Sequence, residues 1–130
     1  MFELLKHTCY NGGNLRHVRE ALLDADCQLI MAVELQFDTL TVTICAVADD
    51  DTIAVVPGPF VGPSRQTISS LWVPCIGKSL QWAWLMTNQQ GYMDGARLEF
   101  NDPGNPQSVI VELVAGASSL SVYLARPTEA

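Results

Sequence analysis

The fold of this protein is decided by residues 28–48, which read QLIMAVELQFDTLTVTICAVA. Before the central Asp38-Thr39, every second side chain is apolar, namely Leu29, Met31, Val33, Leu35 and Phe37. After it, the same period of two places Leu40, Val42, Ile44, Ala46 and Ala48 on one face. Because this period is typical of half-buried strands, the stretch predicts a β-hairpin with Glu34 and Thr43 on its outer face.

Further segments alternate in the same way, at 52–56, 78–87, 96–100, 109–113 and 120–124, with Gly-, Pro- and Asn-rich turns between them. Strands at this spacing predict a mainly β (or α+β) fold. We expect an antiparallel meander that forms a barrel-like sheet or a sandwich, with one or two short helices. Since no repeat or long linker divides the chain, residues 1–130 are expected to form a single domain.

Helical alternatives remain open in three places. Residues 15–23 fit two turns of helix, with Asn14 as the N-cap, as well as they fit an irregular strand. A short helical turn is expected around 64–71, and the good helix formers in 78–87 keep a helix open there beside the strand. The residues before the Asn11–Asn14 turn are expected to be a short, mobile leading segment.

The three tryptophans lie close together, at positions 72, 82 and 84. In a regular strand over 78–87, Trp82 and Trp84 share a face with Leu80 and Met86. We therefore expect Trp82 and Trp84 to be buried together in the core beneath the sheet.

The chain is acidic, with seven Lys and Arg against fourteen Asp and Glu and a net charge of −7. This sign argues against nucleic acids and anionic membranes as partners. No basic residue occurs from Glu20 to Ser64, a stretch that holds Glu20, Asp24, Asp26, Glu34, Asp38, Asp49, Asp50 and Asp51. The field is therefore expected to be lopsided and to attract a basic partner, unless these acids only form a solvated face.

The candidate acidic partner face is Asp49-Asp50-Asp51. These carboxylates lack the ligand spacing and the central glycine of a calcium loop, and Asp is also a common turn residue. No metal site and no cofactor is expected.

The four cysteines form no CxxC and have no zinc-ligand spacing. No stretch has the length of a signal peptide or a membrane span, so free thiols and a cytoplasmic location are expected. His7 and Cys9 do not specify a nucleophilic pair, and neither a P-loop nor a GxSxG motif occurs. We assign no catalytic residue, and an enzyme is the less favoured reading.

The most specific pattern spans 84–100: Trp-x-x-x-Asn-Gln-Gln-Gly-Tyr-x-Asp-Gly, followed by Arg97-Leu98-Glu99-Phe100. Together with the upstream Ile76-Gly77-Lys78 and Asp50–Ile53, it resembles a family of small bacterial proteins of unknown function. The resemblance covers roughly residues 28–101. It implies a β-rich bacterial cytoplasmic protein and carries no activity.

The turn in this pattern has two interpretations. Its polar groups could converge into an aromatic-walled pocket whose candidate binding residues are Trp84, Asn88, Gln90, Tyr92 and Asp94. In the favoured structural interpretation, Asn88 and Asp94 bond their own backbone and Tyr92 packs locally.

Three functions follow from these observations. The first is a non-catalytic protein-binding module, such as an immunity-type protein that masks a basic toxin, or an assembly subunit. The second is a small-ligand binder or enzyme that uses the 84–95 turn, with Asp51, Asp94 and Glu99 around one cavity. The third is a structural homodimer formed through a poorly protected edge strand at 120–124.

Overall fold

The computed structural model describes residues 1–23, 29–47, 50–66, 71–116 and 118–125. Its elements, in chain order, are α1 (Phe2–Asn11), β1 (Leu15–Leu22), β2 (Ile30–Phe37), β3 (Thr41–Val47), β4 (Thr52–Pro57), β5 (Ser64–Gln66), the 3-10 turn η1 (Val73–Cys75), β6 (Ser79–Thr87), β7 (Met93–Asp102), β8 (Asn105–Gly116) and β9 (Ser119–Ala125). The mainly β prediction is confirmed.

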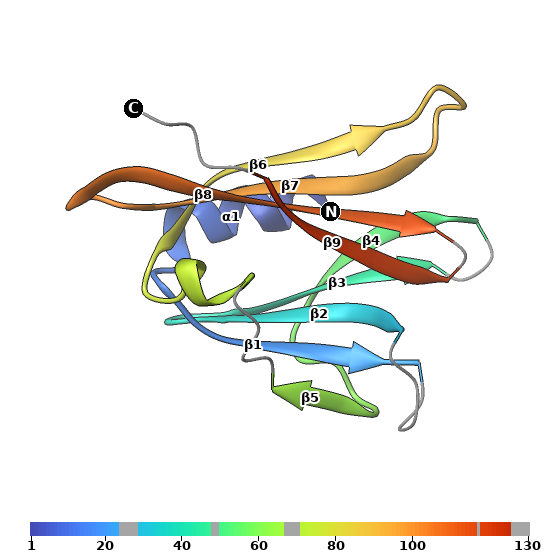
Figure 1. Ribbon diagram of the computed structural model, residues 1–130, viewed down its shortest axis with the longest axis horizontal. Coiled ribbons are helices and arrows are strands. Elements are labelled where there is room, and N and C mark those ends of the chain that lie inside the picture. The colour runs from blue at the N-terminus through green and yellow to red at the C-terminus, as the bar shows by residue number, and fades with distance from the viewer. Residues whose placement is uncertain (24–28, 48–49, 67–70, 117, 126–130) are drawn as a thin grey trace.

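Two antiparallel sheets make up most of the molecule. One has five strands in the order β4-β3-β2-β1-β5, and the other has four in the order β6-β7-β8-β9. Figure 1 shows the four-stranded sheet lying over the five-stranded one. The sheets stay open rather than closing into a barrel, so the protein takes the sandwich form of the two that the sequence predicts.

The predicted hairpin is the β2–β3 pair. Gln36 lies opposite Thr41 in its register, and the Phe37 N–H donates to the Leu40 carbonyl at 2.8 Å across the turn. Val33 and Ile44, both predicted to face inward, are fully buried. The period of two therefore located these strands correctly in this part of the chain.

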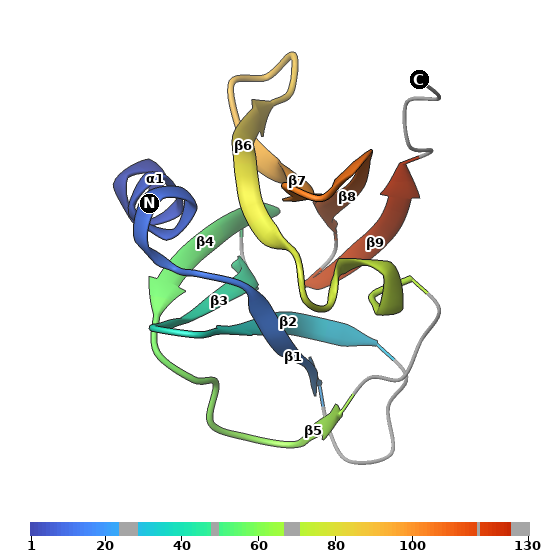
Figure 2. The same cartoon turned by 90° about the vertical axis from the view of Figure 1, so that its left-hand side faces the viewer.

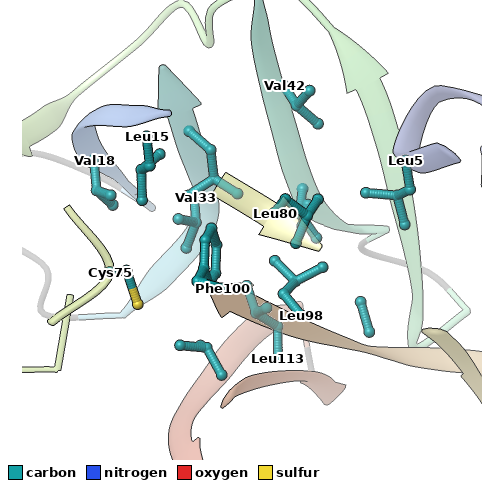
Figure 3. Close-up of a cluster of buried hydrophobic side chains, with 14 of the residues drawn as sticks. Leu5, Leu15, Val18, Val33, Val42, Cys75, Leu80, Leu98, Phe100 and Leu113 are labelled. Carbon is teal, nitrogen blue, oxygen red and sulfur yellow. The ribbon is translucent and has the colours of Figure 1, made fainter. Parts of the chain in front are cut away.

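A single hydrophobic core fills the space between the sheets. Figure 3 shows Val33 and Val42 of the first sheet meeting Leu98, Phe100 and Leu113 of the second. Leu5 of α1 enters this core from the side, because α1 lies beside the edge strands β4 and β6 (Figure 2). The residues expected to form a mobile leader are thus a helix that covers the open edge of the sandwich.

The start of β1 joins the two sheets at one corner. The Leu15 N–H donates to the Lys78 carbonyl, and the Gly77 N–H donates to the Leu15 carbonyl, both at 2.8 Å. Just before it, Gly13 adopts a φ of +78°, and a Cβ there would lie 2.8 Å from the Asp38 Cβ. Only glycine fits this position without strain.

Two of the open alternatives resolve to strands. Residues 15–22 form β1, which lies inside a sheet between β2 and β5, and residues 79–87 form β6. The helical turn expected around 64–71 is wrong for 64–66, which form β5, and residues 67–70 lie outside the described part. Sheet neighbours satisfy the backbone groups of these segments, which outweighs local helix propensity.

The expected burial of Trp82 and Trp84 is wrong. Leu80 lies opposite Phe100 and Trp82 lies opposite Glu99, so Gln81 is an extra residue in β6 and forms a β-bulge. The bulge reverses the alternation: Ala83 and Leu85 pack against the core, whereas Trp82 and Trp84 are 56% and 43% exposed. The buried tryptophan is Trp72, at 2% exposure.

The outer face of the β2–β3 hairpin is also covered, contrary to its expected exposure. Glu34 is 1% exposed because the loop after β4 folds over it. Its Oε1 accepts from Arg19 Nη2 at 2.5 Å and from the Phe60 N–H at 2.8 Å. Beside it, the buried Thr43 hydroxyl donates to the Gly58 carbonyl at 2.8 Å.

The exposure of the tryptophans can be checked by fluorescence. Removing Trp82 and Trp84 together, as Trp82→Phe with Trp84→Phe, leaves Trp72 as the sole emitter. We expect a blue-shifted spectrum that acrylamide quenches weakly, because the remaining indole is buried. The matched Trp72→Phe variant should show red-shifted, strongly quenched emission. Red-shifted, strongly quenched emission from the double variant, with blue-shifted emission from Trp72→Phe, would contradict the bulge.

The buried Glu34 should make stability depend on pH. Burial raises the pKa of Glu34, but hydrogen bonds from Arg19, Gln36 and the Phe60 N–H outweigh it and hold that pKa below its ordinary value of 4.5. Its stabilisation is therefore complete above that value and is lost as the pH falls through the folded-state pKa. Glu34→Gln should lower the free energy of unfolding by about 2 kcal/mol at pH 7.

Urea denaturation at pH 7 and at pH 3 measures this effect. The difference in stability between Glu34→Gln and the parent should narrow at pH 3, because below the ordinary glutamate pKa of 4.5 protonation favours the unfolded chain of the parent. Glu3→Gln, at an exposed position of α1, is the control and should leave stability unchanged at both pH values. If Glu34→Gln lowers the free energy of unfolding equally at pH 7 and pH 3, the ionised Arg19–Glu34 pair is refuted.

Candidate functional site

The outer face of the four-stranded sheet carries a row of aromatic and charged side chains. Trp84, Arg97, Glu112 and Tyr123 are successive cross-strand neighbours on β6, β7, β8 and β9. The Arg97 guanidinium carbon lies 5.6 Å from the centroid of the Trp84 ring, and Arg97 Nη1 lies 3.5 Å from Glu112 Oε1. This row thus holds a cation between an aromatic ring and a carboxylate.

The adjacent row on the same face differs from the row through Trp84. Trp82 lies opposite Glu99, which lies opposite Ile110. Ring and carboxylate are both present, but among the described residues no cation pairs with Glu99 or lies over the Trp82 ring. Trp82 is the more exposed of the two indoles on this face.

In the turn between β6 and β7, Asn88 bonds the backbone, whereas Asp94 bonds the Asn88 side chain. Asn88 Oδ1 accepts from the Gln90 and Tyr92 N–H groups at 2.9 and 3.2 Å, and its Nδ2 donates to Asp94 Oδ2 at 3.2 Å. Gly91 takes a φ of +85°, and Asp94-Gly95 lies within β7. Asn88 and Asp94 are therefore occupied in holding the turn, and the ring of Tyr92 is half exposed.

The acidic stretch is less lopsided than predicted, because arginines outside it pair with its carboxylates. Arg19 pairs with Glu34, Arg65 with Glu20 at 3.1 Å, and Arg16 with Asp38. The hydrogen bond from Arg16, then that from the Asn14 N–H, hold the pKa of Asp38 below its usual value. These pairs form because β1 lies between β2 and β5 in the sheet.

The predicted acidic partner face lies in the turn between β3 and β4. Asp50 and Asp51 are exposed there, and Asp49 lies outside the described residues. Asp51 has a φ of +51°, a conformation that Asp tolerates in tight turns. Within the described part of the chain, no group of three or more His, Cys, Asp or Glu side chains could hold a metal ion.

A groove lies between α1 and β6. Its volume is about 400 Å³, and the residues that line it are Phe2, Lys6, Cys9, Tyr10, Gln81, Trp82 and Ala83. Asp51, Asp94 and Glu99 are absent from this lining, so the carboxylates proposed as acid or base do not share it. Neither does the groove include Trp84 or the 88–94 turn.

The α1 wall of this groove is absent from the predictions based on sequence. The apolar Leu4 and Leu5, with Thr8 one turn later, are a short helical pattern that could have revealed it. The wall from β6 had no local signal, since Trp82 reaches the surface only because of the bulge at Gln81.

The described cysteines are free thiols, and Cys27 lies outside the described residues. Burial raises the pKa of Cys75 to about 12 and also raises the pKa of Cys9 and Cys45. His7 is on α1 and lies within 3.2 Å of the Asn11 amide, apart from the groove lining that contains Cys9. The arrangement therefore holds no activated thiolate among these three thiols.

Of the helices in the described ranges, none is long and apolar enough to span a bilayer. Comparison with known proteins finds no curated protein and no solved structure that matches the chain. One family matches over residues 3–129, and its description states that its function is unknown. This confirms the resemblance to such a family inferred from the sequence: the chain belongs to the family of unknown function DUF6334.

Proposed function

We propose that this protein is a binding module for a basic protein partner, which it engages through the outer face of the β6–β9 sheet. The observation that carries the proposal is the contrast between two neighbouring rows on this face. The row through Trp84 contains ring, guanidinium and carboxylate, whereas the row through Trp82 and Glu99 shows no cation among the residues that the structure describes. An arginine or lysine of a partner would complete it.

The composition of the face supports a protein partner. Aromatic residues and arginine are the types that dominate binding energy at protein interfaces, and this face exposes Trp82, Trp84 and Tyr123 around Arg97. An exposed group of aromatic side chains on one face of a sheet is typical of an interaction site.

The negative net charge of the chain supports a positively charged partner. A net charge of −7 attracts a basic protein and speeds its association at low salt. On the face itself, Arg97 is offset by Glu112, and within the described ranges no cation pairs with Glu99. The partner's cation would therefore meet both a favourable long-range field and a specific contact.

Removal of the Trp82 ring and reversal of the charge at position 99 test the proposal. Immobilised full-length protein is used to capture a partner from source cells at low salt, and the captured protein is then purified. We expect a basic partner whose affinity, measured by calorimetry, falls on the order of thirtyfold with Trp82→Ala. Glu99→Lys should weaken binding by at least about tenfold, because the cation would meet a like charge.

Glu3→Lys is the matched control, since it makes the same charge change at an exposed position of α1. It should alter the affinity far less than Glu99→Lys does. The proposal would be overturned if no protein is captured at low salt. It would also be overturned if neither Trp82→Ala nor Glu99→Lys changes the affinity for the captured partner.

A second function, a structural homodimer, is favoured by the position of β9. This strand is an edge of the sheet, its residues Ser119–Ala125 carry no charge, and Tyr123 and Leu124 are exposed. An uncharged edge allows two copies of an acidic chain to pair there without repulsion between the paired strands.

Light scattering at micromolar concentration distinguishes this alternative. If two β9 strands pair, the parent should show the mass of a dimer, and Ser121→Lys should convert it to a monomer by placing like charges across the edge. Ser79→Lys, at the start of β6, is the control. A parent that is strictly monomeric removes the homodimer.

A further inference from the structure

The groove between α1 and β6 contains an unusual cation. Six of the seven Lys and Arg side chains belong to described residues, and five of the six have a partner. Four arginines pair with carboxylates, and Lys78 donates to the Pro74 carbonyl at 2.8 Å. Lys6, which lines the groove, is the described Lys or Arg side chain for which the structure shows no partner.

Apart from Gln81, the rest of the lining is apolar or aromatic. Phe2, Tyr10 and Trp82 bring three rings to a space of about 400 Å³, which is the size of a small-molecule site. Figure 2 shows α1 beside β6, whose edge on this side has no neighbouring strand. The groove therefore offers flat, apolar walls against which a planar ring of a ligand can pack.

The charge in the groove decides the sign of its ligand. Three aromatic rings alone would suit an organic ammonium ion. The ammonium of Lys6 in the same lining disfavours such a cation, and no carboxylate of the lining offsets it. Burial raises the pKa of the Cys9 thiol, so this side chain stays neutral and adds no negative charge.

Lys6 is the one positively charged side chain of the lining, which suits a ligand with a single negative charge. Phosphate sites use several positive or N–H donors, often with arginine in a bidentate contact. This groove contributes one ammonium and the amide of Gln81, which suits a carboxylate.

We propose that the groove between α1 and β6 binds a small molecule that joins one carboxylate to a flat apolar ring. The carboxylate contacts the Lys6 ammonium and the Gln81 amide, and the ring lies among Phe2, Tyr10 and Trp82. This site does not rest on the protein partner. It shares Trp82 with the sheet face, but Lys6 belongs to the groove alone and Glu99 to the sheet face alone.

Three probes with the same ring and different head groups test the proposal on the full chain. Indole-3-acetate is anionic, indole-3-acetamide is neutral and tryptamine is cationic. Calorimetric titration, with amide chemical-shift changes to locate the site, should show that the acetate binds about tenfold more tightly than the acetamide. Tryptamine should bind most weakly, and the shifts should centre on 2–10 and 81–83.

Variants of the lysine give the decisive comparison. Lys6→Gln should reduce the affinity for indole-3-acetate to that of the acetamide, and Lys6→Glu should reverse the preference in favour of tryptamine. Lys78→Gln makes the same charge change as Lys6→Gln outside the groove and should leave the affinity unchanged. Equal binding of acetate and acetamide, no binding of any probe at millimolar concentration, or an effect of Lys78→Gln equal to that of Lys6→Gln would overturn the proposal.

Discussion

At Gln81, β6 contains one residue more than the strand that pairs with it, and this bulge determines which side chains the second sheet buries. A regular strand would carry Leu80, Trp82 and Trp84 on one face. The extra residue shifts the alternation, so Leu80 stays in the core while both indoles turn outward. Ala83 and Leu85 take the inward positions opposite Leu98 and Ala96, where small and branched side chains fit between the sheets.

The outward turn of the indoles produces both candidate binding features. On the sheet face, Arg97 lies over the Trp84 ring, while the described part of the chain places no cation in the row through Trp82. At the sheet edge, Trp82 forms one wall of the groove whose other wall is α1. The bulge at Gln81 thus brings both indoles to the surface. Trp84 contacts Arg97 there, and the Trp82 ring is the one that we propose binds a partner or ligand.

The distribution of charge also depends on how the strands are ordered. Along the chain, the acids from Glu20 to Asp51 have no basic neighbour within their stretch. In the sheet, however, Arg19 of β1 reaches Glu34 of β2, and Arg65 of β5 reaches Glu20 of β1. Ion pairing across strands therefore leaves a more even surface than the linear pattern indicates, and Lys6 becomes the cation that lacks a partner within the described chain.

The sequence by itself determined the β2–β3 hairpin, the strands β4, β7, β8 and β9 and the Asn88 turn, because side-chain period and turn chemistry act between near neighbours. It also pointed to the correct kind of family. Tertiary structure alone decided that Glu34 is covered by the loop through Phe60, and that Lys6 faces Trp82 across a groove. It also decided that Trp82 is exposed, since a bulge arises only when the register of β6 must satisfy β7 and the core at once. These outcomes depend on contacts between segments far apart in the chain, which no local pattern encodes.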